Sequence, residues 1–211
     1  MTAWLTVIGL GEDGLDGISP AARALIDGAE LLVGGQRHLS KVPDNGTERL
    51  SWKGGFHEQV GVLEKHKDKR VVVLASGDPF CYGVGSVLAR HYEADEIFTV
   101  PAPGAFSLAA SRMGWSLPDL ESLTIHGRPL EALNRFLFSG LRLLVLSRDG
   151  DSPAEVAALL TARGFGPSSI TVLEHLGGDL EKRLDGTASD WKHTRAADLN
   201  TLAIDCRAEA G

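Results

Sequence analysis

The sequence has few cysteines and no long apolar run. Its two cysteines, Cys81 and Cys206, are too few for a disulfide framework, which favours a reducing compartment. No apolar run approaches the roughly 20 residues that a transmembrane helix needs. The N-terminal residues lead directly into a strand pattern, without a basic region or a cleavage signal. We therefore expect a cytoplasmic protein that is neither exported nor inserted in a membrane.

Basic residues are also in the minority. The chain has 21 Lys and Arg against 28 Asp and Glu, a net charge of −7, whereas nucleic-acid-binding proteins usually carry a basic surface. A P-loop and a G-x-S-x-G element are both missing, which weakens NTP-dependent and hydrolase functions. The seven histidines show no spacing typical of a metal site. We expect no nucleic-acid partner and no metal.

What the chain does contain is a regular alternation of strand and helix patterns, which predicts an α/β fold in two lobes. The residue pattern changes around Ser116-Leu117-Pro118-Asp119, and we place the lobe boundary there. The two predicted lobes are residues 1–116 and residues 117–211. Helices are predicted over residues 20–28, 56–67, 83–92, 105–113 and 151–164. Strands are predicted over residues 5–8, 31–33, 71–74, 97–100, 122–125, 141–146, 170–173, 181–184 and 202–205.

The most informative segment is the run Val71-Val72-Val73-Leu74-Ala75 followed by Ser76-Gly77-Asp78-Pro79. Consecutive aliphatic residues are typical of a parallel strand buried on both faces. Gly77 and Pro79 force a turn, and the carboxyl end of such a strand is where α/β proteins bind ligands. Asp78 could instead only cap the turn. Cys81 could be a nucleophile, but no base lies near it in sequence, and a small buried hydrophobe is the simpler interpretation.

Gly9-Leu10-Gly11-Glu12-Asp13-Gly14 matches the dinucleotide pattern G-x-G-x-x-G after a strand. The match is poor physically, because Glu12 and Asp13 stand where a pyrophosphate would lie. The best helix start, Ser19-Pro20, comes only later. We therefore expect these glycines to approach an uncharged or cationic part of a ligand, and keep a dehydrogenase-like nucleotide-binding module as the alternative.

Two basic clusters also follow predicted strands. His126-Gly127-Arg128 opens the second lobe, and Gly34-Gly35-Gln36-Arg37-His38 lies in the first. Each could be an ordinary turn with solvated side chains. Arginine also offers a planar fork that suits carboxylates, so two such clusters would suit a polycarboxylate substrate on an otherwise acidic protein.

Three motifs together resemble the S-adenosylmethionine-dependent tetrapyrrole (corrin/porphyrin) methylases, over essentially the whole chain. They are residues 7–11 (VIGLG), 75–83 (ASGDPFCYG) and 123–128 (LTIHGR). Residues 34–39 (GGQRHL) and 176–182 (LGGDLEK) make the chain most similar to the branch that methylates the corrin ring at C-5 in cobalamin biosynthesis. The resemblance implies two α/β lobes, with the cofactor in the cleft between them.

The resemblance also implies where the ligands bind. Glu12 stands where many members have proline, Gly104 and Ala105 where many have a Thr/Ser pair, and Ser147 near a frequent methionine. The implied cofactor contacts are Glu12, Ser76, Gly77, Asp78, Cys81, Gly104, Ala105, Ser147, Leu176, Gly177 and Ala203. The substrate-side candidates are Arg37, His126 and Arg128. No residue is assigned as a catalytic base.

Methyl transfer from a sulfonium needs alignment and exclusion of water more than a strong nucleophile. The implied reaction is C-5 methylation of precorrin-7 or cobalt-precorrin-7, a corrin precursor with carboxylate side chains; methylation at another ring position is the alternative. The resemblance further implies a homodimer. The final residues 207–211 resemble a linker, so we expect a possible fusion to a C-terminal decarboxylating methylase domain.

Overall fold

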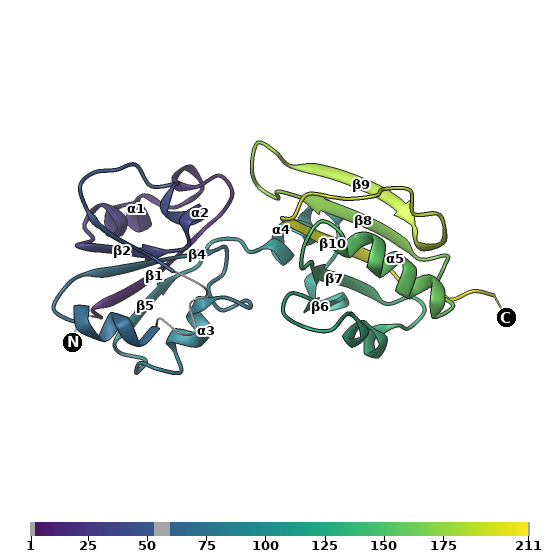
Figure 1. Ribbon diagram of the computed structural model, residues 1–211, viewed down its shortest axis with the longest axis horizontal. Helices are drawn as coiled ribbons and strands as arrows, with labels where there is room; N and C mark the ends of the chain where they lie inside the picture. The colour runs from purple at the N-terminus through teal and green to yellow at the C-terminus, as the bar shows by residue number, and fades with distance from the viewer. Residues whose placement is uncertain (1–2, 53–59, 211) are drawn as a thin grey trace. The chain divides into compact units, whose positions relative to one another are not determined.

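The computed structural model describes residues 3–52 and 60–210 and confirms an α/β fold with two sheets (Figure 1). The chain forms two compact units, one up to Gly104 and the other from Ala105 onward. Among the described residues, no helix is long and apolar enough to cross a membrane.

The first unit is built on an all-parallel sheet of order β3-β2-β4-β1-β5. Its strands are β1 (Leu5–Leu10), β2 (Leu31–Gly34), β3 (Glu48–Ser51), β4 (Val71–Ser76) and β5 (Ile97–Val100). Strand β4 lies at the centre, paired with β1 and β2. Val71 and Val73 belong to the core on one face, and Val72 and Leu74 to the core on the other. The prediction of a strand buried on both faces is therefore confirmed.

The helices of the first unit are short. They are α1 (Pro20–Asp27), α2 (Gln36–Leu39), α3 (Val84–Leu88) and the 3-10 turns η1 (Leu15–Gly17) and η2 (Val60–His66). Helix α1 begins as predicted, because Ser19 Oγ accepts a hydrogen bond from Ala22 N at 3.1 Å, and it ends at Gly28. The helix predicted over 83–92 is wrong in length, because i to i+3 hydrogen bonds from Arg90 and His91 tighten the chain after Leu88.

The structure tests only part of the helix predicted over residues 56–67. Residues 56–59 lie outside the described residues, and residues 60–66 form the 3-10 turn η2 instead of an α-helix. Val60 and Leu63 are the buried residues of η2, and Tyr92 Oη donates to Val60 O at 2.8 Å. Tertiary contacts thus hold this turn against the core.

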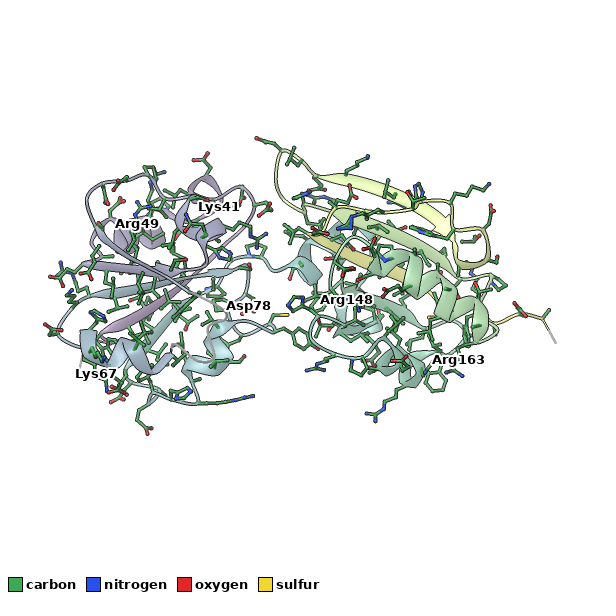
Figure 2. The ribbon with its side chains drawn as sticks, in the orientation of Figure 1. Lys41, Arg49, Lys67, Asp78, Arg148 and Arg163 are labelled. Atoms are coloured by element: carbon green, nitrogen blue, oxygen red, sulfur yellow. The ribbon has the colours of Figure 1, made fainter. Side chains whose placement is uncertain are left out.

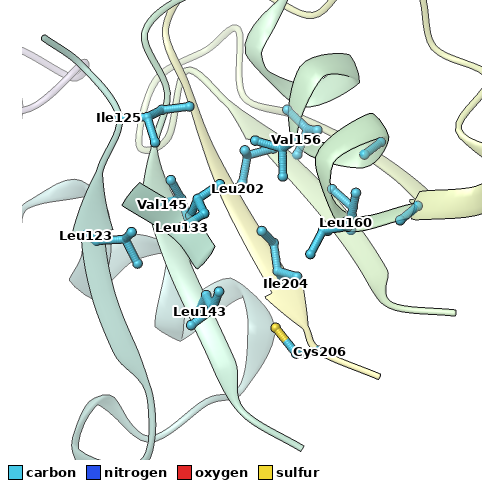
Figure 3. Packing of buried hydrophobic residues seen from close by; sticks show 14 residues of the cluster. Leu123, Ile125, Leu133, Leu143, Val145, Val156, Leu160, Leu202, Ile204 and Cys206 are labelled. Carbon is cyan, nitrogen blue, oxygen red and sulfur yellow. The ribbon is translucent and has the colours of Figure 1, made fainter. Parts of the chain in front are cut away.

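The second unit has a mixed sheet of order β6-β7-β10-β8-β9, in which only β6 and β7 pair in parallel. Its strands are β6 (Glu121–Thr124), β7 (Arg142–Leu146), β8 (Ser169–Glu174), β9 (Lys182–Thr187) and β10 (Asn200–Asp205). The helices are α4 (Ala105–Met113), α5 (Ser152–Ala162) and the 3-10 turns η3 (Leu117–Asp119), η4 (Leu130–Phe136) and η5 (Ala188–Asp190). Figure 3 shows Val156 and Leu160 of α5 in one core cluster with Leu202 and Ile204 of β10.

Helix α4 decides where the two units divide. It packs against β7 and β10, so it belongs to the second unit. Its buried residues Phe106, Ala109 and Ala110 are not members of the core cluster that contains Val156 and Leu160 of α5. The compact units thus divide between Gly104 and Ala105, whereas the sequence places the lobe boundary near residue 116.

Candidate functional site

The Gly-Asp-Pro loop follows β4 and is held by backbone hydrogen bonds on both sides. Gly77 N donates to Leu10 O at 2.9 Å, and Ala102 N donates to Gly77 O at 3.1 Å. Gly77 has φ +48°, and a Cβ added to it would lie 2.7 Å from Gly104 Cα. Only glycine satisfies both the backbone angle and this close approach. The fold therefore brings together two predicted cofactor residues, Gly77 and Gly104.

Asp78, labelled in Figure 2, hydrogen-bonds to the backbone of its own loop. Its Oδ1 accepts a hydrogen bond from Phe80 N at 2.9 Å, and its carbonyl oxygen accepts one from Cys81 N at 3.1 Å. A Cβ added to Gly104 would lie 3.5 Å from both Asp78 N and Asp78 Cβ. Asp78 therefore organises the loop, as the turn-capping interpretation requires, and it lies beside Gly104.

Cys81 is half-buried, and its surroundings do not activate it as a nucleophile. Burial, with a smaller contribution from Asp78, raises the pKa of its thiol, so the unreactive protonated form predominates at neutral pH. The next residue, Tyr82, has φ +54°, a strained conformation for a non-glycine residue. Such strain occurs often in ligand-binding loops.

The Gly9–Gly14 segment differs from a dinucleotide fingerprint. A Cβ on Gly9 would lie 1.8 Å from Gly77 O, so Gly9 is required for contact with the neighbouring loop. Gly14, at φ +62°, donates from N to Gly11 O and leads into η1. Helix α1 begins only at Pro20. The helix that would hold a pyrophosphate therefore does not start at the third glycine.

Glu12, Arg37 and Ser76 meet at the carboxyl edge of the first sheet. Arg37 Nη1 lies 3.3 Å from Glu12 Oε1, and Arg37 Nη2 donates to Ser76 Oγ at 2.9 Å. Lys41 Nζ lies 3.1 Å from the same Glu12 oxygen and donates to Glu12 O at 2.8 Å. His38 Nε2 lies 2.9 Å from Ser76 Oγ. We call these five residues the Glu12 cluster.

Two cations lie on the Glu12 carboxylate and compensate its negative charge. The Glu12 cluster consequently has a net positive charge. Burial, followed by the charges of Arg37 and Lys41, lowers the pKa of His38 to about 4, so its imidazole is neutral at pH 7. The neutral Nε2 can accept the Ser76 hydroxyl proton.

Lys41 was not singled out from the sequence. The available signal was its position four residues after Arg37, which places the two side chains on one side of a helical turn. His38 was noted only as part of the basic cluster.

The second unit contains the remaining cofactor candidates. Leu176 is buried and Gly177, at φ +84°, follows it in the loop after β8. Ser147 is buried, and its hydroxyl donates to Asn200 Oδ1 at 2.5 Å, so this hydroxyl is already engaged. Ala203 is buried in β10, where it pairs with Leu144 and Thr171. These residues therefore occupy loop and strand positions of one sheet. The remaining candidate of this unit, Ala105, is the half-buried first residue of α4.

His126 and Arg128 form an exposed turn directly after β6. His126 N donates to Thr124 Oγ1 at 3.0 Å, and Arg128 N donates to Ile125 O at 3.3 Å. Gly127 between them has φ +67°. The turn therefore presents both basic side chains at the surface, as a carboxylate-binding turn would. Within the part of the chain that the structure describes, no three His, Cys, Asp or Glu side chains lie close enough together to hold a metal ion.

Comparisons with known proteins match the sequence and the fold of this chain to one family. The family model of the Tetrapyrrole (Corrin/Porphyrin) Methylases matches residues 4–191. A Sinorhizobium protein named precorrin-6Y C(5,15)-methyltransferase [decarboxylating] is 43% identical over the whole chain, which covers 51% of that protein. The chain thus spans about half the length of this relative.

A relative of similar length also matches. The cobalt-precorrin-7 C(5)-methyltransferase of Salmonella typhimurium LT2 is 32% identical over 84% of this chain and 88% of its own. The crystal structure of the precorrin-6Y methylase from Archaeoglobus fulgidus superposes with a TM-score of 0.75 at 22% identity, over 97% of this chain and 98% of that one. The family-model match and these identities show that the chain belongs to the tetrapyrrole (corrin/porphyrin) methylases, a family of methyltransferases.

Proposed function

We propose that this chain transfers a methyl group from S-adenosylmethionine to C-5 of a corrin precursor, precorrin-7 or its cobalt-containing form. The observation that carries the proposal is the 32% identity with the Salmonella cobalt-precorrin-7 C(5)-methyltransferase, which this chain matches over 88% of that enzyme's length. The Sinorhizobium and Mycobacterium tuberculosis relatives are named C(5,15)-methyltransferases, so their names include C-5 as one of two positions.

The residues present fit S-adenosylmethionine better than a dinucleotide. The Gly-Asp-Pro loop offers the Asp78 carboxylate, which suits a cationic ligand, whereas the carboxylate of Asp13 would repel a pyrophosphate. In addition, α1 does not start at the third glycine of the G-x-G-x-x-G pattern. The proposed contacts remain Glu12, Ser76, Gly77, Asp78, Cys81, Gly104, Ala105, Ser147, Leu176, Gly177 and Ala203. Of these, Ser147 would contact the cofactor through its backbone, because Asn200 engages its hydroxyl.

When bound, S-adenosylmethionine supplies an electrophilic methyl group on a sulfonium. The chain's task is then to align the donor with an electron-rich ring carbon and to exclude water. A rigid loop serves this purpose: Gly77 is fixed to Leu10 and Ala102, and Asp78 fixes Phe80. We assign no general base, and the high pKa of Cys81 removes that thiol as a candidate.

The substrate proposal rests on charge. A corrin precursor carries several carboxylates, and the Glu12 cluster has two cations on one carboxylate. Arg37 is the exposed cation of the two, with 46% of its side chain accessible against 17% for Lys41. We therefore propose Arg37, together with His126 and Arg128, as binding residues for substrate carboxylates.

Two measurements test this function. Purified chain, S-adenosylmethionine and precorrin-7, with and without cobalt, should give a singly methylated product whose new methyl group is located at C-5 by NMR. Methylation at another ring position would contradict the proposed specificity for C-5. Calorimetric titration should show S-adenosylhomocysteine binding on the order of micromolar strength and no NAD binding. The opposite result would favour the nucleotide-binding alternative and overturn the methylase proposal.

We also propose a domain organisation, an oligomeric state and a cellular compartment for this protein. Because the chain spans about half of the Sinorhizobium relative, whose name includes a decarboxylating activity, a longer form of this protein would carry that second activity in another domain. We also propose a cytoplasmic homodimer, which size-exclusion chromatography with light scattering and cell fractionation would test.

A further inference from the structure

A single carboxylate links helix α4 to the loop that follows β8. Glu181 Oε1 accepts a hydrogen bond from Arg112 Nε, and Glu181 Oε2 accepts one from Arg112 Nη2 at 3.0 Å. The same Oε2 accepts a hydrogen bond from Gly177 N at 2.7 Å. Arg112 lies in the last turn of α4, 69 residues before Glu181. The two-pronged ion pair therefore connects a helix to a loop backbone through one side chain.

The backbone of this loop has positive φ angles at two positions, and the first is strained because its residue is not a glycine. His175 has φ +46° and Gly177 has φ +84°. His175 N donates to Leu199 O, and Gly178 N donates to His175 O, both at 3.0 Å. A Cβ on Gly177 would lie 3.3 Å from Leu108 Cδ1 of α4, so the loop also packs closely on this helix. A strained conformation persists only where surrounding contacts hold it, and Glu181 supplies one of these contacts directly.

The ion pair itself contributes little to global stability. The Arg112 and Glu181 side chains are 41% and 27% exposed, and exposed ion pairs are weak because water and salt screen them. The guanidinium of Arg112 lowers the pKa of Glu181, so its carboxylate is ionised at neutral pH and accepts all three hydrogen bonds. The effect of the pair is therefore local, on the geometry of the loop.

We infer that Arg112 and Glu181 are positioning residues, which fix the backbone of residues 175–178 so that Leu176 and Gly177 can bind the methyl donor. This inference rests on the proposed function, because the donor is the ligand proposed for that loop. Arg112 acts through Glu181, and Glu181 acts through Gly177 N–H; neither needs to touch the donor. The pair would thus lower the ordering cost that the loop incurs when the ligand binds.

The test compares variants at both ends of the pair by calorimetric titration with S-adenosylhomocysteine. Glu181→Ala and Arg112→Ala should each raise the Kd about tenfold, because each removes charge-assisted hydrogen bonds that hold the loop. Arg112→Lys keeps the charge but loses the fork, so its Kd should be intermediate. Arg183→Ala is the matched control, since Arg183 makes a comparable two-pronged pair with Asp185 on β9. It should bind as the wild type does.

Amide hydrogen exchange separates local positioning from general damage. In Glu181→Ala and Arg112→Ala, exchange should accelerate in residues 175–178 and stay unchanged in β7 and β10, with little change in Tm. In turnover assays, the KM for S-adenosylmethionine should rise about tenfold while kcat changes little, because the reacting atoms are not touched.

Three failures can be distinguished. Wild-type affinity in Glu181→Ala and Arg112→Ala would overturn the positioning role and leave the proposed function intact. Absence of binding by the wild-type chain would overturn the proposed donor, and the positioning role with it. Variants that lose affinity together with protection throughout the second unit would overturn the inference in favour of a purely structural ion pair.

Discussion

Gly9 and Gly77 approach so closely that a Cβ added to Gly9 would lie 1.8 Å from the Gly77 carbonyl oxygen. That oxygen accepts a hydrogen bond from Ala102 N, so it cannot move away without breaking the bond. Gly9→Ala should therefore destabilise the first unit by about 3 kcal/mol, as overpacked sites do. Urea denaturation measures the change.

Gly61→Ala is the control, because among the described residues beyond its chain neighbours no atom lies within 4 Å of a Cβ built on Gly61. Its stability should stay within about 0.5 kcal/mol of the wild type, as for most surface substitutions. Equal stabilities for Gly9→Ala and Gly61→Ala would contradict the close contact between the two loops.

Asp78 can be tested for two separate roles. Asp78→Asn keeps an oxygen that can accept from Phe80 N–H but removes the charge, whereas Asp78→Ala removes both. If Asp78 acts by shaping the loop, the alanine variant should bind S-adenosylhomocysteine about tenfold more weakly while the asparagine variant binds nearly normally. Equal losses in both variants would indicate a charge contact with the ligand. Unchanged affinity in both would leave Asp78 as a turn cap alone.

His38 should make stability depend on pH. Its pKa is lowered to about 4 in the fold from 6.5, so the unfolded chain binds more protons between these values. The contribution of the neutral imidazole is fully present above pH 6.5 and is lost as the pH falls toward 4. His38→Gln, which can keep a bond to Ser76, should flatten this slope. Urea midpoints measured at several pH values from 4 to 7 give the comparison, and parallel curves for both proteins would contradict a buried neutral His38.

The two cysteines should differ in reactivity. Cys206 has no exposed surface, and burial raises the pKa of its thiol to about 11. Cys81 is half-buried, with a more modestly raised pKa. At pH 8 a thiol reagent should modify Cys81 slowly and Cys206 only after denaturation. Mass spectrometry identifies the modified residue, and rapid labelling of Cys206 in the folded protein would refute its burial.

Arg37 should affect the substrate more than the donor. Arg37→Ala removes the more exposed cation of the Glu12 cluster, and the KM for the corrin substrate should rise about tenfold, as for loss of a charged hydrogen bond. Because Arg37 also bonds Glu12 and Ser76, two proposed donor contacts, the affinity for S-adenosylhomocysteine should fall by a smaller factor than the KM rises. Arg70→Ala is the control. Arg70 lies just before β4 and bonds to Glu30 and to Gly28 O. A normal KM in Arg37→Ala would exclude Arg37 from substrate binding.

Sequence reasoning predicted the elements whose own residues specify them. Strand β4 was evident because five consecutive residues are buried and aliphatic, and α1 because Ser19 and Gly28 mark its ends. Strand β3 was missed, because Glu48, Arg49 and Ser51 are polar and its pairing to β2 at the sheet edge decides its structure. Helix α2, with four residues, was too short to show a periodicity.

The residues of the candidate site likewise divide into those that local sequence predicts and those that tertiary packing brings together. The Gly-Asp-Pro loop could be located from local turn chemistry, since Gly77, Asp78 and Pro79 are adjacent. The partners of Glu12 could not, because Arg37 and Lys41 follow it by 25 and 29 residues. Nor could the Arg112–Glu181 pair, whose members lie on different elements. Contacts of this kind are set by tertiary packing, which a single sequence does not reveal.

The pairing pattern of the first sheet has a kinetic consequence. Leu5 of β1 pairs with Val71 and with Ile97, so the central strands join parts of the chain that are synthesised far apart. In the second sheet, Glu174 and Lys182 already pair across the short β8–β9 connection. Local pairings form faster than distant ones, because less chain entropy is lost in closing the loop. The β8–β9 hairpin should therefore acquire protected amides earlier during refolding than β1 and β4 do, so that the loop of Leu176 and Gly177 forms before the Gly-Asp-Pro loop.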